Sequence, residues 1–248
     1  MQPSLPTKPQ PEPENKCPGC LYLKLEGIPV QPEDQDIFAL WHTSTQHQQI
    51  NLYLTIKFDE QWHAIENGRI KFGLKGGELR LKLENSEIPY EDRELSGSIE
   101  LSMPQQRQEL DATKEGKGDR TIAKTQSSLS PEKKPVSTGS ISFTVCHITT
   151  KISEENPVWI FEEEKGESVL KGLLKKTKLA TLSAIAFPCR VEATFEVSKR
   201  DVCLTDAEGL WPPTISRNKR AVLDRLIIQR LLEPKFKPYL SRAELHYD

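Results

Sequence analysis

The chain has 248 residues, of which 28% are charged and 36% hydrophobic, a balance that suits one large domain or two small ones with some disordered length. Its 34 basic and 36 acidic residues give a formal net charge of −2, which excludes a global electrostatic attraction to nucleic acid or membranes. The sequence holds no run of about 18 apolar residues and no N-terminal apolar stretch typical of a signal peptide. We therefore expect no membrane segment.

The cysteines indicate a reducing compartment. They are odd in number and, beyond one C-x-x-C pair, show no regular spacing, so they do not form a disulfide framework. They are Cys17, Cys20, Cys146, Cys189 and Cys203. We expect reduced thiols in a cytoplasmic protein.

The N-terminal part divides into a tail and a β-rich segment. Residues 1–16 are polar and rich in proline, which predicts a disordered tail. Alternation of apolar and polar residues begins directly after Cys20 and continues through residues 17–103 in short runs separated by turn residues. Such runs are typical of antiparallel sheets.

Residues 69–84 show the clearest alternation, on both sides of Gly76-Gly77. Two alternating runs joined by two glycines are typical of a β-hairpin, because glycine adopts positive φ at low cost. The spacing predicts that Leu74 lies opposite Leu79 and that Phe72 lies opposite Leu81, with all the apolar side chains on one face.

The alternation stops at Pro104. Residues 104–136 have too few large aliphatic side chains to offset the entropy of ordering them, which predicts a disordered loop. Alternating runs resume over residues 137–248, and the two β-rich segments form either two domains or one. We expect a mainly β fold, an antiparallel β-sandwich or open barrel of about 10–12 short strands, with one C-terminal α-helix.

That helix is predicted over residues 217–232, with Ser216 as N-cap and Pro234 as the residue that ends it. Its apolar residues form two arcs rather than one, which is typical of a helix packed on two sides. One arc contains Leu223, Leu226, Ile227 and Leu231. The other contains Ala221, Ile228 and Leu232, and we predict that these three contact a partner protein.

The segment 217–242 is also the main concentration of basic residues, which suggests phosphate binding as an alternative. The candidate nucleic-acid-binding residues are Arg217, Lys219, Arg220, Arg225, Lys235 and Lys237. Only Phe236 and Tyr239 offer aromatic rings that could stack on bases. The competing interpretation is a covering helix whose basic side chains lie at its rim.

Cys17 and Cys20 could supply two ligands of a zinc site, with His42 and His47 as the other two. The interval between the two pairs is longer than in zinc fingers, and the alternative is two ordinary thiols. A redox role would require the C-x-x-C pair to begin a helix, whereas here it precedes a predicted strand.

The sequence contains no G-x-S-x-G, no phosphate-binding glycine loop and no H-E-x-x-H motif. We therefore predict a non-catalytic protein-interaction module, a subunit or adaptor of a larger assembly, with other protein subunits as partners and no cofactor apart from the zinc hypothesis. A nucleic-acid-binding protein is the first alternative. A hydrolase whose site is not visible in the sequence is the second.

Overall fold

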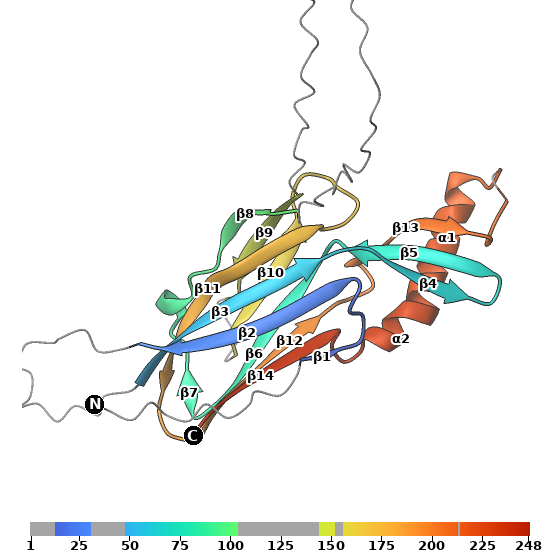
Figure 1. Ribbon diagram of the computed structural model, residues 1–248. Helices are drawn as coiled ribbons and strands as arrows, with labels where there is room; N and C mark the ends of the chain where they lie inside the picture. The colour runs from blue at the N-terminus through green and yellow to red at the C-terminus, as the bar shows by residue number, and fades with distance from the viewer. Residues whose placement is uncertain (1–12, 31–47, 104–143, 152–155, 213) are drawn as a thin grey trace, which may run out of the picture. The chain divides into compact units, whose positions relative to one another are not determined.

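The computed structural model describes residues 13–30, 48–103, 144–151, 156–212 and 214–248 (Figure 1). These residues form antiparallel sheets and one C-terminal helical segment, so the predicted mainly β fold is confirmed. The described residues contain fourteen strands, two of them only two residues long. No helix in this part of the chain is long and apolar enough to cross a bilayer.

The largest sheet has seven strands, and its neighbours pair antiparallel. In spatial order these are β1 (Glu14–Asn15), β14 (Ser241–Tyr247), β12 (Cys189–Glu196), β6 (Gly76–Glu84), β10 (Val158–Glu163), β9 (Thr144–Thr150) and β8 (Gly97–Leu101). Strands from both sides of residues 104–136 alternate in this sheet, so the two β-rich segments form one unit. Residues 104–136 themselves lie outside the described residues, and the disordered loop stays a prediction.

The other described strands form two smaller sheets. The four-stranded sheet contains, in spatial order, β2 (Leu21–Pro29), β3 (Gln48–Phe58), β11 (Gly172–Ala184) and β7 (Ser86–Glu87). The three-stranded sheet contains β13 (Val202–Glu208), β5 (Gly68–Leu74) and β4 (Gln61–Ile65). A short 3₁₀ turn at Tyr90–Asp92 precedes β8.

The core lies between the four-stranded and seven-stranded sheets. Phe58 of β3 lies 5.8 Å from Phe195 of β12 and 6.1 Å from Phe161 of β10, measured between ring centroids. All three rings are almost fully buried, and their tilted contacts are favourable aromatic geometries. The two inner faces therefore pack as in a sandwich.

The disordered tail predicted over residues 1–16 is wrong for its last residues. Glu14 pairs with Arg242 and Asn15 with Ser241, so β1 adds an edge strand to the seven-stranded sheet inside the segment predicted to be disordered. The backbone N–H of Lys16 donates to the carbonyl oxygen of Leu240 at 3.0 Å. Residues 1–12 lie outside the described residues.

The predicted hairpin over 69–84 is wrong, although its alternation is right. The inward apolar side chains of both strands are buried except Leu83, which is partly buried. However, β5 pairs with β4 and β13, whereas β6 pairs with β10 and β12. The chain therefore passes from one sheet to another at Lys75. Gly76 is needed for a close approach rather than for a turn, because a Cβ there would overlap the carbonyl oxygen of Phe161. The actual hairpin joins β4 to β5, with Ile65 opposite Gly68.

The C-terminal helical segment has three parts, α1 (Arg217–Ile227), the π-helical turn η3 (Ile228–Leu232) and α2 (Glu233–Phe236). Its predicted start is confirmed, because the Ser216 side chain accepts a hydrogen bond from the N–H of Lys219.

The predicted end is wrong, since the helix continues through Pro234. The N–H of Glu233 donates to the carbonyl oxygen of Ile228, five residues earlier, and this widened turn places Pro234 in the first turn of α2. A proline is tolerated there because its missing N–H would have no helical partner.

Candidate interaction site on the C-terminal helix

The helical segment is anchored by its C-terminal half. Ile228, Leu232 and Phe236 are buried at successive four-residue intervals, with exposed fractions of 8%, 1% and 3%. The Phe236 ring lies 5.7 Å from the ring of Phe72 in β5. The segment thus covers the three-stranded sheet, beside which it lies in Figure 1, and belongs to the protein's own core there.

This anchoring overturns the predicted partner interface. Ile228 and Leu232 face the core, and of the three predicted residues only Ala221 is exposed. On a helical wheel that ends at Leu232, the two arcs are about equally apolar. Phe236 lies beyond that predicted end. When Phe236 is added, the arc that contains Ile228 and Leu232 becomes the more apolar one and the stronger candidate for the core.

The N-terminal half of the segment has the opposite character, since α1 has no buried residue. Val222 is 58% exposed, Leu226 41% and Leu223 37%. Leu226 follows Val222 by four residues and Leu223 by three, the spacings at which residues are neighbours on one helical side. We call Val222, Leu223 and Leu226 the exposed apolar face of α1. Large apolar side chains grouped on a surface commonly mark a binding site.

Exposed cations occur on several sides of α1 and of the turn that follows it. Arg217, Lys219, Arg225 and Arg230 are exposed, and none of their side chains forms an ion pair with another described residue. Arg217 and Lys219 stand in the first turn, where a positive charge opposes the helix dipole instead of stabilising it. Their position therefore does not stabilise the helix. Two cations in the first turn are visible in the sequence and indicate that α1 has a role other than packing.

The remaining predicted phosphate-binding residues each contact another side chain of the protein. The Arg220 guanidinium lies 5.7 Å from the centroid of the Trp211 ring, and Lys237 forms an ion pair with Glu233 at 2.8 Å. Lys235 Nζ lies 2.6 Å from His63 Nε2. Burial lowers the pKa of His63, and the positive charge of Lys235 lowers it further, so the neutral imidazole accepts this hydrogen bond.

The free cations also do not follow one line. At 100° per residue, Lys219 and Arg225 lie about 120° apart around the helix axis, and Arg217 lies on a third side. A phosphate backbone is bound by cations arranged along one track. Lys219 and Arg225 thus lie beside the exposed apolar face, whereas Arg217 lies about 180° from Leu226, on the opposite side of α1. Lys235 and Lys237 follow in α2 and at its C-terminal end.

Two of the cavities among the described residues border α1 or η3. One of about 350 Å³ is lined by Lys199 and Arg200, from the turn after β12, together with Arg225, Ile228 and Gln229. The other, of about 670 Å³, lies between β4 and the helix. Its lining includes His63, Ile65, Leu210, Leu231 and Lys235. Among the described residues, three cations and no acidic side chain line the first cavity, which makes it suited to an anionic group.

Asp224 lies on the inner side of α1, and its Oδ1 atom is buried without a hydrogen-bond partner among the described residues. Burial raises the pKa of Asp224, although the positive charge of Arg220 acts in the opposite direction. The folded state therefore binds a proton more tightly than the unfolded chain, and the ionised carboxylate destabilises the fold.

We expect Asp224→Asn to increase the free energy of unfolding at neutral pH, by less than about 1 kcal/mol because solvent screens the partly exposed side chain. The gain should be complete above the raised pKa and disappear below the ordinary value of 3.8, where aspartic acid is neutral in both states. Urea unfolding at several pH values measures this. The exposed Glu91→Gln is a matched control, and an equal gain there would contradict the explanation.

The predicted zinc ligands are only partly described. Cys17 and Cys20 are buried in the core, and the Cys17 thiol donates to Gln61 Oε1 at 3.0 Å. The hydrogen bond between the two thiols lowers the pKa of Cys17 and raises that of Cys20. Among the described residues no three His, Cys, Asp or Glu side chains are grouped as metal ligands. His42 and His47 lie outside the described residues, so the four-ligand zinc site stays a prediction.

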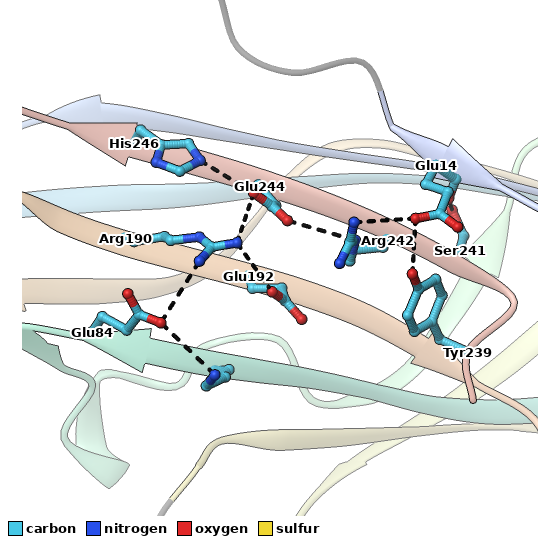
Figure 2. Close-up of polar contacts among 10 residues, drawn as sticks. Glu14, Glu84, Arg190, Glu192, Tyr239, Ser241, Arg242, Glu244 and His246 are labelled. Atoms are coloured by element: carbon cyan, nitrogen blue, oxygen red, sulfur yellow. Dashed lines mark hydrogen bonds and ion pairs between the residues drawn. The ribbon is translucent and has the colours of Figure 1, made fainter. Parts of the chain in front are cut away.

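The outer face of the seven-stranded sheet carries a network of ion pairs (Figure 2). Glu192 and Glu244 stand directly opposite on β12 and β14, where two like charges repel. Arg190 lies between them, with Nη2 2.9 Å from Glu244 and 3.4 Å from Glu192. Burial tends to raise the pKa of Glu244, but hydrogen bonds from His246 and Arg190 and the charge of Arg242 lower it overall. These contacts are those of structural ion pairs.

Comparison of the chain with protein-family models, with curated proteins and with solved structures found no match.

Proposed function

We propose that the protein is a non-catalytic interaction module that binds another protein through the exposed apolar face of α1. The observation that carries this proposal is a helix of eleven residues with no buried residue and three large apolar side chains exposed to solvent. Isolated helices of this length are marginal in water and normally depend on packing. A partner that covers Val222, Leu223 and Leu226 would supply that packing for α1.

Other observations support the same function. The anchored half of the segment fixes the position of α1, and binding to a preorganised surface costs less entropy. All five cysteines are free thiols, which fits the proposed cytoplasmic location among other protein subunits. The carboxylates in Figure 2 are held by cations, which favours a structural over a catalytic role for them.

Nucleic-acid binding is the second candidate, and the free cations on α1 favour it. The apolar side chains between those cations fit it less well, because phosphates do not contact them favourably. An interface with a protein uses both features, with apolar residues at the centre and charged residues at the rim.

The proposal is tested by introducing a charged residue at the centre of the exposed apolar face of α1. We expect Val222→Glu or Leu226→Glu to weaken partner binding at least tenfold, since burying an unpaired carboxylate is costly. Full-length tagged chain is recovered from cells of the source organism, and its bound proteins are compared with those of each variant. Val222 is 58% exposed, so the thermal unfolding midpoint should stay unchanged.

Ile185→Glu is the matched control, because Ile185 is 55% exposed in the turn between β11 and β12. Proteins retained by the wild type and by Ile185→Glu, but lost from both α1 variants, would support the proposal. If both α1 variants retain the same proteins as the wild type, the face is not the binding site.

A further inference from the structure

Given the proposed function, we infer that the partner is a different protein that contributes an acidic, amphipathic segment. Its apolar residues cover the exposed apolar face of α1, and its carboxylates meet the cations beside that face. One of these carboxylates enters the cavity between Lys199, Arg200 and Arg225.

The charge of the helical segment indicates the charge of its partner. Residues 217–237 contain seven basic and two acidic residues, a net charge of +5 in a chain whose formal charge is −2. Of the two acidic side chains, Glu233 is paired with Lys237, and Asp224 lies on the inner side of α1. The outward surface is therefore positive around an apolar centre. A complementary surface has an apolar ridge between acidic residues.

The smaller cavity supplies a specific place for a partner carboxylate. Three of its lining residues, Lys199, Arg200 and Arg225, are exposed cations, and no acidic side chain in the described part of the chain lines it. Arg225 stands on α1 one residue before Leu226, so the cavity adjoins the exposed apolar face. A carboxylate placed there would accept charge-assisted hydrogen bonds and reduce the repulsion between the three cations.

The same charges argue against a second copy of this chain as the occupant. Two α1 helices placed face to face would match their apolar residues but oppose two segments that each carry a net charge of +5. Like charges opposed at an interface disfavour that pairing. In sedimentation velocity at low salt we expect the purified chain to be a monomer. A dimer that Val222→Glu dissociates would overturn the inference.

The decisive experiment identifies the residues that contact α1. A photo-crosslinking amino acid replaces Leu226 in the full chain, the chain is mixed with lysate of the source organism, and the attached peptide is sequenced. We expect a segment of another protein with aspartate or glutamate within about four residues of the attachment point. A basic or uncharged segment, or one from this chain, would overturn the inference.

The role of the cavity is tested with the partner so identified. Arg225→Glu should weaken its binding at least tenfold at 50 mM salt and much less at 500 mM, because salt screens charge pairs. Lys175→Glu makes the same charge change at an exposed position of β11 and should bind as the wild type.

Different results would reject the proposed function and the acidic partner. If Val222→Glu abolishes binding while Arg225→Glu does not weaken it, the proposed function stands and the acidic partner is rejected. If Leu226 yields no more crosslinks than the same probe at Ile185, the proposed function fails, and the inference fails with it.

Discussion

Replacing Leu232 by alanine should lower the free energy of unfolding by about 2–5 kcal/mol, the usual range for deleting a buried leucine side chain. Leu232 is 1% exposed and lies in the core between the π-helical turn and the three-stranded sheet. Removing its side chain loses apolar burial and leaves a cavity that the surrounding strands cannot fill completely. Urea unfolding followed by circular dichroism measures the change, and an unchanged m-value would show that two-state behaviour is kept.

Leu226→Ala is the matched control, since it is the same substitution in the same helical segment. Leu226 is 41% exposed, so its change should stay within about 0.5 kcal/mol. Both substitutions alter helix propensity by the same small amount, and their difference therefore reports burial. Equal effects would mean that the two sides of the helix are assigned incorrectly, and the proposed interface would lose its basis.

Gly76→Ala should destabilise the protein by about 3 kcal/mol or more. The added Cβ would overlap the carbonyl oxygen of Phe161, a backbone atom of the paired strand β10. Backbone in the middle of a seven-stranded sheet cannot move away without breaking ladder hydrogen bonds. Thermal or urea unfolding gives the magnitude, and the exposed neighbour Lys75→Ala should change the free energy of unfolding by no more than about 0.5 kcal/mol.

Gly76→Asn tests whether Gly76 is needed for its close approach to Phe161 or for a hairpin turn. Asparagine adopts positive φ more readily than other residues, so in a hairpin turn it would be tolerated better than alanine. At a site of close approach it should be at least as destabilising as alanine, because it is larger. Recovery of stability by asparagine would contradict the arrangement in which β5 and β6 belong to different sheets.

Much of the β-structure could be predicted from local patterns. The alternation of Ile70, Phe72 and Leu74, and of Leu79 and Leu81, predicted which side chains face inward, and all five are buried. A period of two follows from the geometry of a single strand and needs no knowledge of its neighbours.

The candidate site was predicted less well. The cations at the start of α1 were visible in the sequence, but the exposed apolar face was not. Both apolar arcs of the helix have the composition of a packed surface, and a helical wheel does not show which arc meets the core. Phe236 shows which arc meets the core, but the helix was predicted to end before Pro234, so Phe236 was not included in the wheel. The π-helical turn that accommodates Pro234 forms where Ile228 and Leu232 pack into the core, so tertiary contacts accompany the longer helix.

By itself the sequence determined the class of fold, the inward side of the strands around Gly76 and the start of the helix at Ser216, because these follow from interactions within a few residues. Strand partners depend on contacts between distant segments: β6 pairs with β12, whose residues follow more than a hundred positions later. Gly76-Gly77 fits both a turn and a close approach, and only the position of Phe161 decides between them. In the same way, only packing against the three-stranded sheet, whose strand β13 contacts η3, decides that Leu232 belongs to the core and Leu226 to the surface.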